Sequence, residues 1–143
     1  MTDPWYGKTM GQTEIQDFLN EQATGVLSLS KDGQAYGIPM SFAWEKETER
    51  AIMDFGFADG SKKREFIETT EEVCLTVYEW NSPNDWRSVV VTGSLGKLAE
   101  EDVDDDLVSW YYDVAKDIDV SGSVELEWYE LDADEISGTA LYE

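Results

Sequence analysis

The residues best equipped for chemistry form one short cationic turn, Ser61-Lys62-Lys63-Arg64, which directly follows Gly60. Three of the ten basic residues stand side by side here, in a chain whose net charge is −22. A helix is expected to begin at this point with Ser61 as its N-cap. Free backbone N–H groups, the positive end of the helix dipole, a hydroxyl and two ammonium groups would then converge. Charge-assisted donors of this kind bind phosphate, so the turn predicts a phosphate-binding site.

A second interpretation treats the same run as an ordinary helix surface. Its cations would then pair with Glu65, Glu68 or Glu71 along the helix. Lysine near a helix start is electrostatically unfavourable unless an anion is present, which favours the phosphate interpretation. The local sequence alone leaves both interpretations open, because short motifs occur by chance.

The residue types that are missing narrow the possible chemistry. Histidine is absent and Cys74 is the single cysteine. A Ser-His-Asp triad, a soft-metal cluster and an internal disulfide are therefore excluded, and we expect no metal. If the protein is an enzyme, a cofactor is expected to supply its reactivity.

The acidic residues, 32 against 10 basic ones, are spread along the whole chain. Such a field repels nucleic acid and anionic membranes, so we expect neither as a partner. The size and even spread of the excess favour adaptation to high salt over an ordinary solvated surface. No apolar run approaches the length of a membrane span, and the first residues do not resemble a signal peptide. We therefore expect a single cytoplasmic domain over residues 1–143.

Hydrophobic periodicity places the turn within a mainly β fold with flanking helices. Helices are expected over 12–22, 61–70 and 100–116. Strands are expected over 26–30, 35–44, 51–57, 73–80, 86–98, 124–131 and 136–141. Asp32-Gly33 is a hairpin signal, and Pro39 implies an edge, a bulge or an opening in the ladder. Six or seven strands joined by tight turns predict a small antiparallel barrel, with the helices after the third and fifth strands covering its openings.

The order of these segments resembles a known family. It contains Ile38-Pro39-Met40-Ser41-Phe42, then Gly60-Ser61-Lys62-Lys63, then Val73-Cys74-Leu75-Thr76-Val77, and then Trp86-Arg87-Ser88 before a valine run. This succession is similar to the pyridoxamine 5′-phosphate oxidase-like family of FMN-binding split barrels, and most similar to its nitroimidazole-resistance-type branch. The resemblance covers residues 12–98, with a weaker echo over 126–141.

The resemblance implies a set of residues that contact FMN. They are Met40, Ser41, Phe42, Ala43, Asp54, Phe55, Ser61, Lys62, Lys63, Arg87 and Ser88. Residues 61–63 would bind the phosphate, the backbone and small polar side chains of residues 40–43 would run along the ring and ribityl chain, and Ser88 would contact the ribityl chain or the phosphate. Arg87 is a candidate second cation. The family also implies a homodimer with FMN at its interface, where Trp86, Trp128 and Tyr129 are candidates to stack.

Two departures limit what the resemblance implies. Relatives often carry a histidine near the position of Asp54, and the substrate-binding residues of true pyridoxamine phosphate oxidases are not recognisable here. The leading hypothesis is therefore an FMN-dependent oxidoreductase acting on a small redox substrate. One alternative is a reductase of the same fold that uses the deazaflavin F420. Another is a non-catalytic flavin-binding or redox-sensing dimer.

Overall fold

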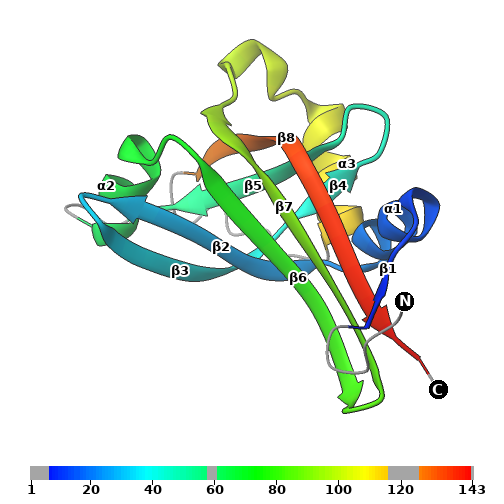
Figure 1. Ribbon diagram of the computed structural model, residues 1–143. Coiled ribbons are helices and arrows are strands. Elements are labelled where there is room, and N and C mark those ends of the chain that lie inside the picture. Colours follow the sequence, from blue (N-terminus) through cyan, green and yellow to red (C-terminus); the bar gives the residue numbers. More distant parts are fainter. Residues whose placement is uncertain (1–6, 58–60, 116–125, 143) are drawn as a thin grey trace.

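The computed structural model describes residues 7–57, 61–115 and 126–142. Eight strands form one antiparallel sheet in the order β3-β2-β6-β7-β8-β5-β4, with β1 added beside β8 (Figure 1). The elements are β1 (Lys8–Thr9), α1 (Gln12–Glu21), β2 (Thr24–Lys31), β3 (Gln34–Ser41), β4 (Ala43–Glu45), β5 (Arg50–Gly56), α2 (Lys62–Thr69), β6 (Val73–Ser82), β7 (Asp85–Lys97), the 3₁₀ helix η1 (Glu100–Asp102), α3 (Asp105–Ala115) and β8 (Leu126–Leu141). No helix within the described ranges is long and apolar enough to cross a bilayer.

The sheet closes because its two outermost strands are neighbours in sequence. β3 and β4 stand at opposite ends of the strand order, yet Phe42 alone separates them in the chain. The sheet must therefore curl until its edges approach, which produces the expected barrel. The prediction of one continuous strand over 35–44 was wrong. The chain leaves β3, at one edge of the sheet, after Ser41, and from Ala43 it forms β4 at the other edge. Of the three alternatives that Pro39 implies, the structure shows the edge, because β3 is an edge strand of the sheet.

Two other predicted elements differ in extent. A single strand of 16 residues, β8, replaces the two predicted strands because a bulge bends it without ending it. At that bulge Thr92 pairs with Glu135 and Gly93 pairs with Ala133, which leaves Asp134 as the extra residue. The predicted helix over 100–116 divides into η1 and α3. The backbone N–H of Leu107 donates to Asp104 Oδ1 over 2.8 Å, a side-chain cap that starts α3 anew.

The barrel interior is filled by alternate residues of the strands. Core positions on five strands include Leu27, Leu29, Ala51, Met53, Phe55, Val73, Leu75, Val77, Val89, Val91, Tyr129 and Leu131. Phe18 and Leu19 of α1 and Phe66 and Ile67 of α2 complete this core. A buried hydrogen bond of 2.7 Å from Trp44 Nε1–H to Gln16 Oε1 ties α1 to β4.

A second, smaller cluster lies on the outer side of β4 and β5. Ala43 and Ile52 pair across these strands and pack with Tyr111 and Ala115 of α3. Ile52 alternates with core residues of β5, so it points to the opposite face of the sheet. The prediction that the helix after the fifth strand covers a barrel opening was therefore wrong: α3 covers an outer face.

Candidate functional site

The cationic turn begins α2, as the sequence predicts. Ser61 is the N-cap, and its Oγ accepts the backbone N–H of Arg64 over 3.1 Å. The hydroxyl hydrogen of Ser61 is not used in that bond. Within the described ranges no acceptor takes the backbone N–H of Lys62 or Lys63. The start of α2 therefore presents a hydroxyl, two amides and the positive end of a helix dipole, which is the arrangement that binds anions.

The two lysine side chains lie over aromatic rings. Lys62 Nζ is 5.1 Å from the ring centroid of Tyr36 and 5.6 Å from that of Phe66. Lys63 Nζ is 5.9 Å from the ring centroid of Phe57. Among the described residues, no carboxylate forms an ion pair with either lysine. The alternative in which both lysines pair with glutamates along the helix is therefore not what the described residues show; the nearest effect is on Glu65, whose pKa is lowered by a hydrogen bond from Lys31 and, at longer range, by the charge of Lys62.

Arg64 behaves differently from the two lysines before it. Its Nη1 lies 3.3 Å from Glu68 and 2.8 Å from Glu127, and its guanidinium carbon lies 4.3 Å above Phe57. Burial lowers the pKa of Arg64, but hydrogen bonds and charge from the two glutamates outweigh it and raise the pKa overall. Arg64 is thus turned toward carboxylates, whereas no ion pair of Lys62 or Lys63 is found among the described residues.

Glu127 joins three elements through two ion pairs. Its carboxylate lies 2.6 Å from Lys97 Nζ and 2.8 Å from Arg64 Nη1. The hydrogen bond from Lys97 lowers the pKa of Glu127; burial opposes this, and the charge of Arg64 adds to the lowering. The stabilisation is therefore present above the ordinary value of 4.5 and is lost as pH falls through the lower folded-state pKa.

We expect Glu127→Gln to reduce the free energy of unfolding by about 1 kcal/mol near neutral pH, since solvent screens both cations. The difference from the wild type should shrink at acid pH, where the wild-type carboxyl is itself protonated. Urea unfolding across a pH series measures both. Glu71→Gln, at a residue without a described ion pair, is the control. If the free energy of unfolding of Glu127→Gln differs from that of the wild type by the same amount at every pH, this account is contradicted.

Asp54 and Phe55 point to opposite faces of β5. Asp54 is 9% exposed and accepts hydrogen bonds of 3.0 Å from the hydroxyls of Tyr111 and Tyr112, which fasten α3 to the sheet. Phe55 faces the core and stacks on Phe57 with ring centroids 5.6 Å apart. Phe55 is therefore linked through Phe57 to the cations of α2, whereas Asp54 faces the second cluster.

Residues 40–43 and two of the candidate stacking residues lie away from the start of α2 in the chain and differ in burial. Met40 and Ser41 are half-buried on β3, while the side chains of Phe42 and Ala43 are fully buried. Residues 42 and 43 therefore present neither side chain nor backbone to a ligand at the surface of the single chain. Of the candidate stacking residues, Tyr129 is buried in the core and Trp128 packs against Tyr111 in the second cluster.

Arg87 and Ser88 lie on β7, apart from the cationic turn. Arg87 pairs with Glu79 over 3.0 Å, and its guanidinium carbon lies 4.6 Å from the ring centroid of Phe18 in α1. α1 and α2 stand on different sides of the molecule (Figure 1). Ser88 is half-buried opposite Thr139. Within one chain, therefore, the structure gathers residues 61–63 but does not bring Arg87 to them.

Two residues at the turn were missed by sequence reasoning, Tyr36 and Phe57. Phe57 ends the third predicted strand just before the turn, which is a weak local signal. Tyr36 is separated from Lys62 by two strands and comes near it through the closure of the barrel. No local pattern in the sequence indicates that contact.

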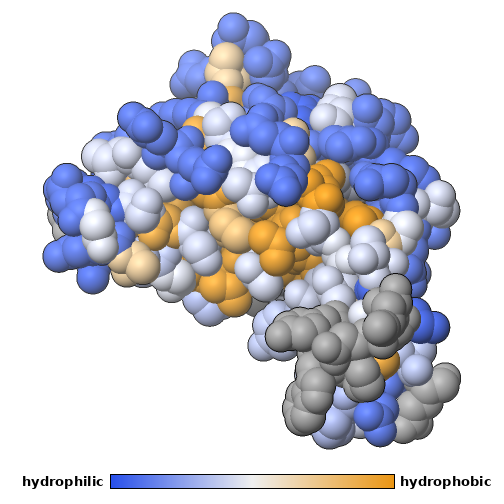
Figure 2. Space-filling view, viewed as in Figure 1, coloured by the Kyte–Doolittle hydropathy of each residue, from blue (hydrophilic) through white to orange (hydrophobic). Residues whose placement is uncertain are grey.

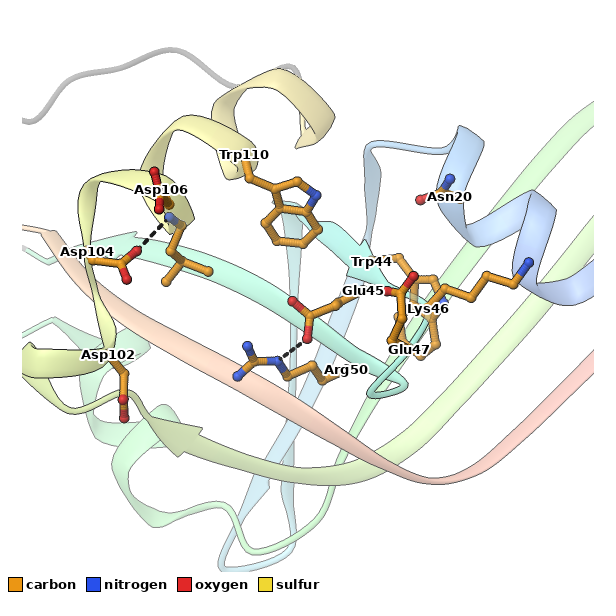
Figure 3. A pocket seen from close by; sticks show the side chains of 11 residues that line it. Asn20, Trp44, Glu45, Lys46, Glu47, Arg50, Asp102, Asp104, Asp106 and Trp110 are labelled. Atoms are coloured by element: carbon orange, nitrogen blue, oxygen red, sulfur yellow. Dashed lines mark hydrogen bonds and ion pairs between the residues drawn. The ribbon is translucent and has the colours of Figure 1, made fainter.

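A separate cavity of about 570 Å³ lies among α1, the β4–β5 hairpin, η1 and the start of α3 (Figure 3). Trp110 points into it toward Glu45 and Arg50, and Arg50 is held by Glu45 over 3.0 Å. Its lining residues are Asn20, Trp44, Glu45, Lys46, Glu47, Arg50, Asp102, Asp104, Asp106, Leu107 and Trp110. Carboxylates outnumber cations in this lining, so the cavity does not suit a phosphate, and none of the predicted cofactor residues lines it.

Comparison with known proteins identifies the fold. A FAD-binding protein from Mesorhizobium loti superposes with a TM-score of 0.79 at 21% identity, over 95% of this chain and 97% of that one. The FAD-binding protein from Mycobacterium smegmatis superposes with a TM-score of 0.71 at 17% identity, over 95% of this chain and 99% of that one. A putative 5-nitroimidazole antibiotic resistance protein from Bacteroides thetaiotaomicron superposes with a TM-score of 0.64 at 14% identity, over 93% of this chain and 87% of that one.

The sequence itself supports the same assignment. No curated protein matches it. The family model described as pyridoxamine 5′-phosphate oxidase matches residues 11–140, which includes the barrel strands and the start of α2. The resemblance inferred from the order of the segments is thereby confirmed, and the chain belongs to the pyridoxamine 5′-phosphate oxidase family of split barrels.

Proposed function

We propose that this protein is a cytoplasmic flavin-dependent oxidoreductase that binds FMN with the phosphate at the start of α2. The observation that carries the proposal is the pair of lysines without a described ion pair beside the Ser61 cap, in a chain of net charge −22. Family membership supports it, as do the FAD-binding relatives from Mesorhizobium and Mycobacterium. Bound flavin would supply hydride transfer to and from a small redox substrate.

The residues at the start of α2 fit a phosphate dianion. The Ser61 hydroxyl and the amides of Lys62 and Lys63 would donate to its oxygens, and the two ammonium groups would balance its charge. Arg64 stays with its two glutamates. Hydride transfer does not require a protein acid or base at the flavin, which suits a chain that has no histidine.

Reconstitution tests flavin binding directly. Apoprotein mixed with excess FMN is expected to retain a flavin absorption spectrum after gel filtration and to quench flavin fluorescence. Mass spectrometry of the released chromophore after expression separates FMN from FAD and from F420, the deazaflavin alternative. A protein that retains none of the three refutes the proposal. Bound flavin that no nicotinamide or other donor reduces supports the non-catalytic alternative.

The outer face of the barrel sheet is the proposed dimer interface. Pro39, Val26, Thr76 and Val90 lie in one row across β3, β2, β6 and β7. Figure 2 shows an apolar area in the middle of this face. Exposed apolar patches of this kind mark interaction sites. We propose that a second copy covers the row, so that a homodimer with the flavin at its interface supplies contacts that one chain lacks.

Introducing a charge into this row is expected to separate the dimer. Val90→Glu places a carboxylate within the row of the proposed interface, where it would be desolvated without a partner. Light scattering coupled to gel filtration should show the mass of two chains for the wild type and of one chain for the variant. Ser109→Glu, at an exposed position of α3, should remain dimeric. A monomeric wild type excludes the interface.

The acidic surface predicts strong salt dependence, which is the proposed adaptation to high salt. Raising salt from about 0.1 M to about 1 M shortens the Debye length from about 10 Å to about 3 Å and relieves repulsion among 32 acidic residues. We expect the melting temperature in KCl to rise by about 5 °C or more. Sucrose at equal osmolality is the control, and an equal rise in sucrose contradicts screening as the cause.

A further inference from the structure

Five of the nine lysines and arginines in the described ranges form ion pairs, all with glutamates. The described ion pairs join Lys31 to Glu65, Arg50 to Glu45 and Glu130, Arg64 to Glu68 and Glu127, Arg87 to Glu79, and Lys97 to Glu127. An ion pair fixes a side chain but also cancels its charge. A lysine that must bind an anion therefore needs another way to be held in place.

Lys62 is held by rings that carry no net charge. Its Nζ lies 5.1 Å from the centroid of Tyr36 and 5.6 Å from that of Phe66. An aromatic face attracts an ammonium through its quadrupole, so the lysine keeps its full positive charge and its donors. The two rings also brace each other, edge to face, with centroids 5.1 Å apart at 76°. Tyr36 is half-buried on β3 and is thus fixed by the barrel.

We infer that Tyr36 is a positioning residue that holds the Lys62 ammonium at the anion site without neutralising it. The inference extends the proposed function, because the anion there is taken to be the phosphate of a flavin. It differs from a direct contact between Tyr36 and the flavin: Tyr36 acts through Lys62, so its effect must depend on the phosphate. Phenylalanine offers the same ring face and should replace tyrosine.

Flavin affinities of Tyr36→Leu and Tyr36→Phe test the inference. Tyr36→Leu is expected to weaken FMN binding about two- to five-fold, the range of a cation–π contact at an exposed site. Riboflavin, which lacks the phosphate, should bind the variant as it binds the wild type. Tyr36→Phe should retain the wild-type affinity for FMN. An equal loss for FMN and riboflavin in the leucine variant overturns the inference, because Tyr36 then contacts the ring system or supports the fold generally.

A second measurement does not depend on flavin. The ε-methylene protons of Lys62 should resonate upfield of free lysine in the wild type and in Tyr36→Phe, because of the ring currents of residue 36 and Phe66, and lose the contribution of residue 36 in Tyr36→Leu. Inorganic pyrophosphate should move this resonance at a lower concentration in the wild type and in Tyr36→Phe than in Tyr36→Leu. An unshifted wild-type resonance overturns the inference even if FMN binds. A shifted resonance that responds to pyrophosphate, in a protein that retains no flavin, upholds it while the proposed cofactor fails.

Discussion

Replacing Lys62 and Lys63 together by alanine is expected to weaken FMN binding about one hundred-fold. Each charge-assisted hydrogen bond to a phosphate contributes about 1.5–3 kcal/mol, and exposure of Lys62 favours the lower end of that range. Two such losses amount to about 3 kcal/mol. Riboflavin affinity should change little, since riboflavin has no phosphate. Quenching of flavin fluorescence, titrated with each ligand, measures both affinities.

Lys8→Ala combined with Lys46→Ala provides the matched control. Both residues are exposed, neither has a described ion pair, and the pair makes the net charge two units more negative, as the test variant does. FMN should bind this control about as well as it binds the wild type at moderate salt. Equal losses in the two double variants would indicate a general field effect. Unchanged FMN affinity without Lys62 and Lys63 would place the phosphate elsewhere.

Gly93→Ala is expected to destabilise the fold by about 3 kcal/mol, at the upper end of the usual cost of overpacking. A Cβ at this position would lie 1.9 Å from the carbonyl oxygen of Asp132, 2.8 Å from its carbon and 3.2 Å from the Cα of Ala133. All three atoms are backbone atoms of β8, at the bulge where Asp134 is the extra residue. A side chain cannot rotate away from them, so the strands must separate.

Gly96→Ala, three residues along the same strand, isolates the steric cause. A Cβ there meets nothing within 4 Å. We expect its stability to stay within about 0.5 kcal/mol of the wild type, as for most surface substitutions. The melting temperature of Gly93→Ala should lie about 10 °C below those of the wild type and of Gly96→Ala. Equal melting temperatures for the two alanine variants would show that β7 and β8 do not approach closely at Gly93.

Local chemistry was enough to predict much of this molecule. The Asp32-Gly33 pair does form the β2–β3 turn, with φ of 50° and 78° at its two residues. Ser61 does cap a helix, because its hydroxyl oxygen can accept an N–H three residues ahead. Alternation of Val73, Leu75 and Val77 correctly predicts the core face of β6. Each of these features depends on residues a few positions apart.

Features that depend on distant residues were not predictable in the same way. The bulge at Gly93 lets β8 continue where two strands were expected, because a backbone irregularity has no periodic signal. The ring beneath Lys62 comes from another strand. The resemblance makes Arg87 a candidate second cation for the phosphate, yet its ion pair with Glu79 and its packing on Phe18 place it by α1. In the homodimer proposed above, the second copy would have to supply such a cation to the proposed phosphate site.

The place of β8 in the sheet has a consequence for how the chain is made. β8 lies between β5 and β7 and is also the partner of β1, although its residues, 126–141, are synthesised after all the others it pairs with. Until they leave the ribosome, β5, β7 and β1 expose unpaired edges. The nascent barrel therefore cannot close before β8 has been synthesised, and pairing over such long sequence separations is slow. During that wait, self-repulsion of the acidic chain would help keep incomplete copies from joining edge to edge.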